Sequence, residues 1–413
     1  MPKETKAKRN VKKSILFVAE MLGYGGMSTL ISESGKYLKG RGYSLSLLTV
    51  TTHPQNAAFK NRFKSFSTIY YKKIPSYEGI GNKTRIVFQT LRLFLRVLER
   101  EKIDMLWCTV PLSTIGIMIH PKAWTFSRIF FFLSPLELEL KANFFGNFAD
   151  NALLKKIKTW IYFFITKVSL EFFPVILTCS QYAKSLLIGH YKIKPQKIKI
   201  TPGFISWKKA ELATEEERGR LRKSLGLDPK KFLFFFPSRF EPGKNPELIV
   251  KALQNLNDGR IVVAFSGAYF NPNYYLKWSQ WAIAKNIRRN MTFLQYVSRP
   301  KLRSVYRAAD CVLFTSLDLE TFGFVALESF TQGVPVIGSN AGAIPEMLSK
   351  ADPNLIVKPP NRNGLTQKIK WFMNLKPAER SILAEKCLVA SDQYNSNKNK
   401  DVLYQAMRDV NRE

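Results

Sequence analysis

The chain has 413 residues, of which 46% are apolar, and its formal net charge is +33 at pH 7. The length is typical of two globular domains of about 200 residues, each large enough for its own core. Four cysteines lie far apart without C-x-x-C spacing: Cys108, Cys179, Cys311 and Cys387. We therefore expect buried thiols in a reducing compartment, and the sequence indicates neither a disulfide framework nor a metal site.

The chain starts with a basic tail at 1–13, followed by an apolar run at 15–20. This order resembles a signal peptide, but the apolar run is short, contains Glu20 and leads into a glycine loop. A first buried strand is the favoured interpretation. A helix is expected at 27–42 and a second strand at 45–50.

The alternation of strand and helix continues through the first half. Strands are expected at 103–110, 127–134, 174–180 and 197–203, and helices at 84–101, 153–172 and 181–191. Such alternation is typical of a doubly wound parallel sheet, so we expect a Rossmann-like domain at 14–206.

Two helices of this half, 84–101 and 153–168, combine apolar and basic faces. Each is interpreted as a helix packed on the core, and a membrane anchor remains the alternative. The apolar run at 160–180 is interrupted by Lys167, Glu171 and Pro174, which argues against a transmembrane span.

A second alternation begins after a connecting segment at 206–230. Its strands are expected at 231–238, 260–267, 291–297, 311–316 and 335–339, and its helices at 246–256, 273–286, 299–309, 322–332 and 343–350. We expect a second Rossmann-like domain at 207–385 and a C-terminal helix at 386–413 that packs back toward the N-terminal domain.

The stretch ETFGFVALE lies between the fourth strand of this domain and the next helix. Glu320 precedes the helix and Glu328 lies inside it, about 9 Å away at a rise of about 1.5 Å per residue. A helix N-terminus favours an anion, and Gly323 lets a ligand approach the backbone. Two solvated glutamates are the alternative for the pair taken alone.

Arg239 and Lys244 follow the first strand of the same domain, and Asn245-Pro246 then opens a helix. Two fixed cations beside a helix N-terminus favour an anion, although solvated charges in a loop are the alternative for the pair taken alone.

Four stretches follow one another over roughly 110 residues: the strand and loop with Arg239 and Lys244, the strand end at Gly267, the segment at 291–316, and ETFGFVALE with the strand after it. In this order they resemble the retaining GT-B glycosyltransferases of family 4 (glycosyl transferases group 1). The resemblance implies two Rossmann-like, doubly wound parallel-sheet domains that face a cleft, and transfer of a sugar from a nucleotide-sugar without a metal or another cofactor. It implies that Arg239 and Lys244 bind the donor diphosphate and that Glu320 acts on the sugar. It further implies donor contacts at Gly267, Gln295, Tyr296, Val297, Thr321, Phe322, Gly323 and Glu328, with Glu328 on the ribose.

The N-terminal half matches the family less closely. Its glycine loop holds Gly23, Gly25 and Gly26, which by resemblance approach donor phosphate or acceptor; a plain tight turn is the alternative. Ser28 stands where G-x-G-x-x-G needs its last glycine, so a dinucleotide oxidoreductase is disfavoured.

Many relatives carry a histidine near the transferred sugar. The strand ends that should carry it offer Thr109 and Ser134 instead, and the only histidines are His53, His120 and His190.

Two acidic groups are further candidates for the site. Asp318-Leu-Glu320 looks like a metal-binding triplet of the other glycosyltransferase fold. Arg239 and Lys244 already supply the positive charge that the metal would supply, so a metal site is disfavoured. Glu137 and Glu139 are expected on a solvated edge, with contact to the acceptor as the alternative.

Residues 1–206 hold 32 Lys and Arg against 11 Asp and Glu. Such a basic half attracts anionic partners, including a membrane surface, although a solvated lysine-rich surface is equally compatible. We expect a cytoplasmic hexosyltransferase, at the inner face of the membrane if that half docks there, with a glycan, lipid-linked or polysaccharide acceptor. The alternatives are a non-catalytic GT-B scaffold and a basic protein that binds or glycosylates DNA; nucleic acid is disfavoured because no recognition motif stands out.

Overall fold

The structure is a computed structural model, and it describes residues 13–20, 22, 25–52, 55–75, 80–133, 152–267, 272–294, 297–317, 320–395 and 397–410. The chain forms two compact units. The first comprises Met1–Phe132, Ile165–Leu177 and Tyr404–Glu413, and the second comprises Leu133–Phe164 and Thr178–Leu403.

The first sheet has the strand order β3-β2-β1-β4-β5-β6-β7. Its strands are β1 (Ser14–Glu20), β2 (Ser44–Thr51), β3 (Thr68–Lys73), β4 (Met105–Cys108), β5 (Ser127–Phe132), β6 (Val175–Thr178) and β7 (Ile198–Ile200). β1 pairs in parallel with β2 and with β4, so that Ile15 lies opposite Leu45 and Met105. Residues 15–19 of β1 are fully buried, as expected for a central parallel strand covered on both faces.

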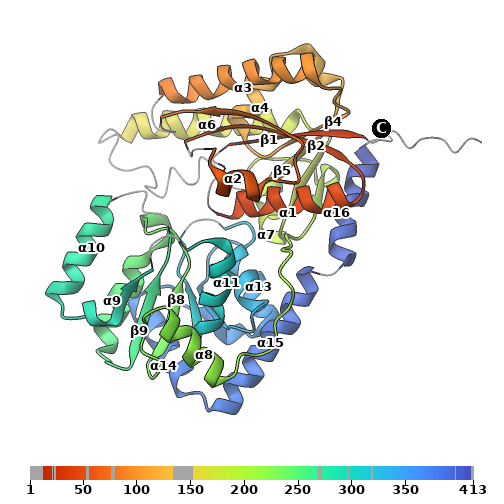
Figure 1. Cartoon of the computed structure of the whole chain (residues 1–413). Coiled ribbons are helices and arrows are strands. Elements are labelled where there is room, and N and C mark those ends of the chain that lie inside the picture. Colours follow the sequence, from red (N-terminus) through yellow and green to blue (C-terminus); the bar gives the residue numbers. More distant parts are fainter. Residues whose placement is uncertain are drawn as a thin grey trace, which may run out of the picture. The chain divides into compact units, whose positions relative to one another are not determined.

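Helices flank this sheet, with α3 and α4 on one face and α1 on the other (Figure 1). The helices of this part of the chain are α1 (Gly26–Gly40), α2 (Ala57–Arg62), α3 (Ile80–Arg100), α4 (Pro111–Met118), η1 (Pro121–Trp124), α6 (Ala152–Glu171), α7 (Gln181–Gly189) and η2 (Pro195–Lys197). Trp107 of β4 stacks on Phe17 and Phe131, at ring-centroid distances of 4.6 and 5.8 Å.

The second sheet has the order β10-β9-β8-β11-β12-β13. Its strands are β8 (Phe232–Phe236), β9 (Ile261–Phe265), β10 (Met291–Phe293), β11 (Cys311–Phe314), β12 (Val336–Ser339) and β13 (Ile356–Val357). Every strand pairs in parallel with its neighbours in this sheet. Both sheets are therefore doubly wound, as the sequence predicted.

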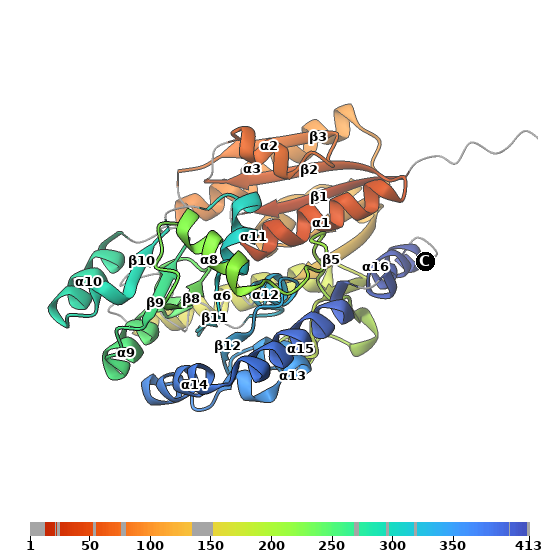
Figure 2. The same ribbon diagram turned by 60° about the horizontal axis from the view of Figure 1, so that its bottom comes forward.

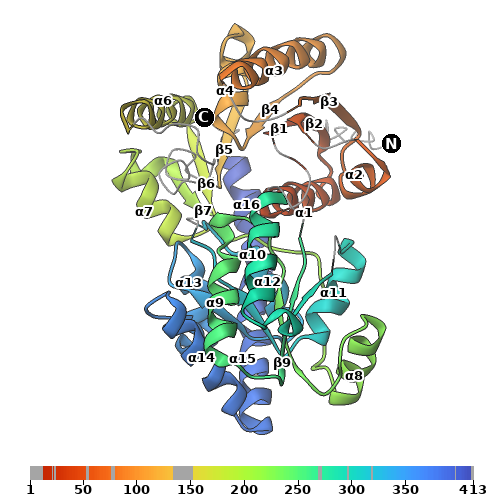
Figure 3. The same cartoon turned by 90° about the vertical axis from the view of Figure 1, so that its left-hand side faces the viewer.

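Helices also flank the second sheet. They are α8 (Glu215–Ser224), η3 (Pro242–Lys244), α9 (Pro246–Leu256), α10 (Pro272–Ala284), η4 (Arg288–Asn290), α11 (Arg299–Ala308), α12 (Phe324–Phe330), α13 (Ile344–Ala351), η5 (Pro353–Leu355), α14 (Arg362–Asn374) and α15 (Pro377–Asn395). The last helix, α16 (Asn397–Val410), runs from the second unit into the first, which holds its residues from Tyr404 onward. α13 packs beside α15 (Figure 2), and α9 packs beside α14 (Figure 3).

Some elements differ from the sequence-based expectation. β2 is followed by α2 and β3, which the pattern did not predict, and β10 and β7 are only three residues long. The helix predicted at 322–332 spans only Phe324–Phe330 because Gly323, at φ 93°, stands before its first residue. Within the described ranges, no helix is both long enough and apolar enough to cross a bilayer.

Candidate functional site

The polar residues of the second sheet gather at its topological switch point. β8 and β11 are neighbours, and the strand order runs outward in opposite directions from them. In open α/β sheets, ligands bind beyond the carboxyl ends of the two strands at such a point. The loop after β8 carries Lys244 and the loop after β11 carries Glu320.

Lys244 and Glu320, 76 residues apart in sequence, form an ion pair at this switch point. Lys244 Nζ lies 2.7 Å from Glu320 Oε1, and the two side chains are 16% and 22% exposed. Ser316 Oγ donates to the same carboxylate oxygen at 3.2 Å. The structure thus brings two of the predicted site residues together where solvent still reaches both.

Hydroxyl groups at the end of β11 fix the lysine loop. Thr315 Oγ1 lies 3.0 Å from the carbonyl oxygens of both Lys244 and Asn245 and shares its proton between them. Ser316 Oγ lies 3.3 Å from Gly243 O, a second acceptor for the proton that also faces Glu320. Asn245, at φ 53°, turns the chain from η3 into α9. The position of Lys244 is therefore set by its backbone as well as by its ion pair.

Arg239 lies on the same loop but has a different partner. Its Nη2 is 2.8 Å from Oε1 of the buried Glu241. Gly267, at the end of β9, packs against the start of this loop, and a Cβ there would lie 2.5 Å from the carbonyl oxygen of Ser238. Gly267 thus permits a close backbone approach beside Arg239.

A second glycine supports the backbone of Glu320. Gly342 has φ 56°, and a Cβ there would lie 2.4 Å from Glu320 O. The neighbouring Ala343 N–H donates to the same carbonyl oxygen at 2.7 Å. The loop after β12 therefore holds the backbone of Glu320, a role that the sequence did not indicate for Gly342.

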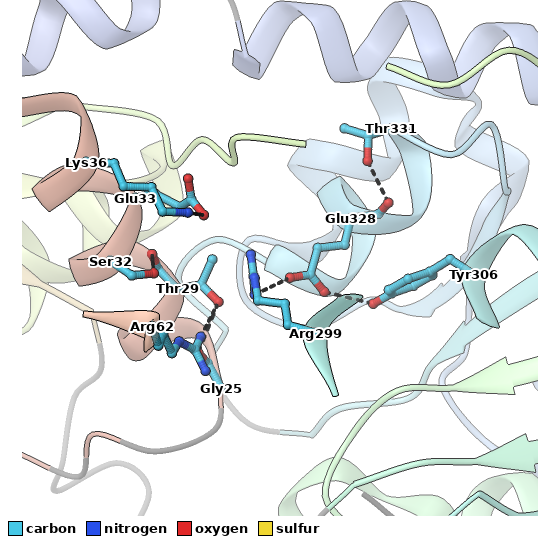
Figure 4. A network of polar contacts seen from close by, with 10 residues as sticks. All are labelled: Gly25, Thr29, Ser32, Glu33, Lys36, Arg62, Arg299, Tyr306, Glu328 and Thr331. Carbon is cyan, nitrogen blue, oxygen red and sulfur yellow. Dashed lines mark hydrogen bonds and ion pairs between the residues drawn. The ribbon is translucent and has the colours of Figure 1, made fainter. Parts of the chain in front are cut away.

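Glu328 is buried on α12, and two side chains of α11 bind its carboxylate (Figure 4). Arg299 Nη1 donates to Oε1 at 3.2 Å, and the Tyr306 hydroxyl donates to Oε2 at 3.0 Å. Burial, together with the charge of Glu328, raises the pKa of Tyr306 well above its usual value, so the phenol stays a donor. A carboxylate has about four lone-pair sites, which leaves acceptor capacity for a ligand hydroxyl.

Sequence reasoning missed Arg299 and Tyr306. They stand seven residues apart, two turns of α11, so both side chains project from one face of that helix. This spacing was visible in the sequence, whereas the pairing of both side chains with Glu328 was not.

The segment between Glu320 and α12 offers mainly its backbone to a ligand. Thr321 and Phe322 are buried; Thr321 Oγ1 donates to Leu133 O, and the Phe322 ring lies 5.5 Å from that of Tyr394. Gly323 takes a left-handed conformation, φ 93°, which favours glycine. Val297 follows β10.

Several predicted residues lie outside the described residues: Gly23, His53, Ser134, Glu137, Glu139, Gln295, Tyr296 and Asp318.

Of the glycine loop, Gly25 and Gly26 are described, with Gly26 the first residue of α1. Arg62 binds the first turn of α1: its Nη2 donates to Thr29 Oγ1 at 3.0 Å (Figure 4). His120 caps η1, its Nδ1 accepting from Lys122 N–H at 3.3 Å, and His190 ends α7.

The first sheet has a corresponding switch point, between β1 and β4. Glu20 ends β1 there, and its Oε1 accepts the N–H of Ser113, near the start of α4, at 2.7 Å. Burial raises the pKa of Glu20 to about 7, against hydrogen bonds from Ser113 that lower it. Thr109, which follows β4, is buried and its N–H donates to Val18 O at 3.1 Å. The sequence did not indicate this role for Glu20, which there only interrupts the first apolar run.

Part of the chain is similar to a known protein family. Residues 217–387 match the model for glycosyl transferases group 1. The D-inositol 3-phosphate glycosyltransferase of Mycobacterium sp. (strain KMS) is 32% identical over 164 residues, which cover 38% of this chain and 35% of that protein. An uncharacterized glycosyltransferase of Methanocaldococcus jannaschii is 25% identical over 46% of this chain and 48% of its own length. The chain thus spans between a third and a half of the length of these curated relatives.

Solved structures resemble the chain over nearly its whole length. Sucrose-phosphate synthase from Thermosynechococcus elongatus superposes with a TM-score of 0.78 at 16% identity, over 97% of this chain and 99% of its own. Anabaena Alr3699/HepE, in complex with UDP and glucose, superposes with a TM-score of 0.74 at 16% identity, over 96% and 100%. The predicted GT-B fold class is confirmed, and residues 217–387 are similar to glycosyl transferases group 1.

Proposed function

We propose that the protein is a retaining, metal-independent hexosyltransferase of family 4 that uses a nucleotide-sugar donor. The observation that carries the proposal is the Lys244–Glu320 pair, 2.7 Å apart at the switch point of the second sheet. A cation and a carboxylate held together there suit a donor whose diphosphate is anionic and whose sugar carries hydroxyls.

In this proposal, Lys244 and Arg239 bind the diphosphate, Glu320 and the backbone at 322–323 bind the sugar, and Glu328 binds the ribose. The bond between the anomeric carbon and the phosphate oxygen breaks, and the phosphate keeps the electron pair. The two cations stabilise that charge without reorganising. An acceptor hydroxyl attacks the same face of the sugar and passes its proton to the departing phosphate.

The partners follow from the same chemistry. Because HepE was solved with UDP and with glucose, a UDP-hexose is the first donor to test. The acceptor is proposed to be a glycan, a lipid-linked sugar or a polysaccharide; the name of the mycobacterial relatives adds a phosphorylated polyol. Four buried free thiols suit the reducing cytoplasm, where we place the reaction.

A thermal-shift panel of nucleotide-sugars tests the proposal, because a bound donor stabilises the folded protein by mass action. One sugar nucleotide should raise the Tm of the wild type but not that of Lys244→Ala, and it should then release nucleoside diphosphate in the presence of EDTA. An NMR spectrum of the product reports whether the anomeric configuration is retained. Binding without transfer to any acceptor would favour the non-catalytic scaffold, and no shift with any donor would contradict the proposal.

A further inference from the structure

Helix α6 exposes a continuous row of large apolar side chains. Ile157, Trp160, Ile161 and Phe164 are 45%, 66%, 44% and 54% exposed. Their spacing of i, i+3, i+4 and i+7 places all four on one side of the helix, and the rings of Trp160 and Phe164 stack at 5.8 Å. We call these four residues the α6 apolar stripe.

The opposite face of α6 is the one that packs on the protein. Tyr162, Thr166, Ser169 and Leu170 are buried there, and Ser169 Oγ donates to Pro111 O at 3.1 Å. The helix therefore does not need the α6 apolar stripe for its own packing. Soluble proteins rarely leave such a patch exposed without a binding partner.

Lysines border the stripe. At 100° per residue, Lys156 and Lys167 fall beside it on one side and Lys158 on the other, and Lys156 is exposed. The sequence has no Asp or Glu from 152 to 170. Long lysine side chains can reach outward from an apolar face toward anionic groups.

We propose that α6 docks on an anionic lipid surface, with the α6 apolar stripe inserted among the acyl chains and Lys156 and Lys158 on the headgroup phosphates. Aromatic side chains with flanking lysines are typical of helices that lie in the membrane interface. The four stripe residues cover about 10 Å of helix, which suits shallow insertion rather than a span.

Charge favours this partner over a second copy of the chain. Pairing the stripe with itself would bring two lysine-bordered helices together, and like charges would repel. A negative lipid surface attracts the same lysines, and each of them raises the binding affinity about fivefold.

Vesicle sedimentation tests the proposal without any sugar nucleotide, so its outcome is independent of the transfer reaction. Wild-type protein should bind phosphatidylglycerol-containing vesicles, bind pure phosphatidylcholine weakly, and dissociate as salt rises from about 0.1 to 1 M. Trp160→Ser with Phe164→Ser should bind about tenfold more weakly or worse. Lys156→Gln with Lys158→Gln should weaken binding about 25-fold.

Matched controls come from the other sheet. Leu276 and Ile283 on α10 are also exposed, at 51% and 62%, so Leu276→Ser with Ile283→Ser removes similar apolar surface elsewhere. Lys230→Gln with Lys285→Gln removes two exposed charges. Both control pairs should bind like the wild type.

A fluorophore locates the contact, because all four cysteines are buried and an introduced thiol would be labelled selectively. An environment-sensitive dye on Ile157→Cys should shift to the blue with anionic vesicles, and the same dye on Ile283→Cys should not. Equal binding to both lipids, unchanged binding of the stripe variant, or a concentration-dependent dimer abolished by Phe164→Ser would overturn the proposal.

Discussion

The switch points of the two sheets have the same strand pattern but different chemistry. In the second sheet, ion pairs dominate: Lys244 with Glu320, and Arg299 with Glu328. In the first, the strand end carries Glu20, whose pKa of about 7 leaves it largely protonated in mildly acidic solution. Several fixed charges close together favour binding of a diphosphate. A carboxyl group whose pKa is near neutral pH can instead donate or accept a hydrogen bond with a hydroxyl group.

The comparison assigns the two sheets different tasks. Charge changes at the second switch point should therefore lower the rate of transfer strongly, whereas a neutral replacement at the first should mainly alter the dependence of stability on pH.

The largest effect is expected from Lys244→Ala and Glu320→Gln. Each should lower kcat roughly several hundredfold, because fixed charges at the departing phosphate and the sugar act in the transition state. Nucleoside diphosphate release measures kcat, and circular dichroism checks the fold. Lys230→Ala, an exposed lysine outside the site, is the control. Near-normal turnover in both variants would remove the basis for the charged donor site.

The next effect is structural, at the loop that supports Glu320. Gly342→Ala should lower the free energy of unfolding by about 4 kcal/mol, because its φ of 56° strains alanine and the new Cβ would collide with Glu320 O. Urea denaturation measures the change. Gly259→Ala is the matched control, since a Cβ there meets nothing within 4 Å. Equal stability of the two variants would show that the loop accommodates the added Cβ without strain.

The sequence predicted well those features that depend on residues close together in the chain. Arg239, Lys244 and Glu320 stand just after apolar strands, and the strand-helix alternation sets where strand ends meet. The sequence therefore anticipated which loops would converge at β8 and β11.

Contacts between elements were not predictable in the same way. The bond from Tyr306 to Glu328 depends on how α11 packs beside α12, which no single periodicity specifies. α6 shows the same limit. The pattern predicted a helix packed on the core, and one face is packed, but a helix with two apolar faces does not reveal which of them stays exposed.

Glu20→Gln sharpens the comparison at the first switch point. The folded protein holds the Glu20 proton up to a pKa of about 7, whereas the unfolded chain releases it near 4.5. Stability therefore falls as pH rises through this window, by about 3 kcal/mol in total. Glutamine cannot ionise and can still accept the Ser113 N–H.

Unfolding free energies of the wild type and Glu20→Gln at pH 5 and 8 measure this effect, because other titrating groups cancel in the difference. The variant should gain about 2.5 kcal/mol on the wild type between the two pH values, because part of the total is already lost at pH 5. An unchanged difference would mean that Glu20 is ionised in the folded protein throughout, and the contrast between the two switch points would weaken.

The smallest expected effect concerns the carboxylate assigned to the ribose. Tyr306→Phe keeps the ring contacts with Trp207 and Phe235, at 5.9 and 5.2 Å, and removes only the hydroxyl that donates to Glu328. A buried hydrogen bond to a charged acceptor contributes about 2 kcal/mol, so stability should fall by that amount. Nucleotide affinity should fall several-fold, because Arg299 alone would then orient the carboxylate.

Tyr394→Phe is the control for this change, since the Tyr394 ring packs on Phe322 and the substitution keeps that contact. Isothermal titration with the nucleotide and urea denaturation report the two quantities separately. If Tyr306→Phe lowers stability but leaves affinity unchanged, Glu328 is a structural carboxylate within the α11–α12 packing, and the charged ligand site of the second sheet contracts to Arg239, Lys244 and Glu320.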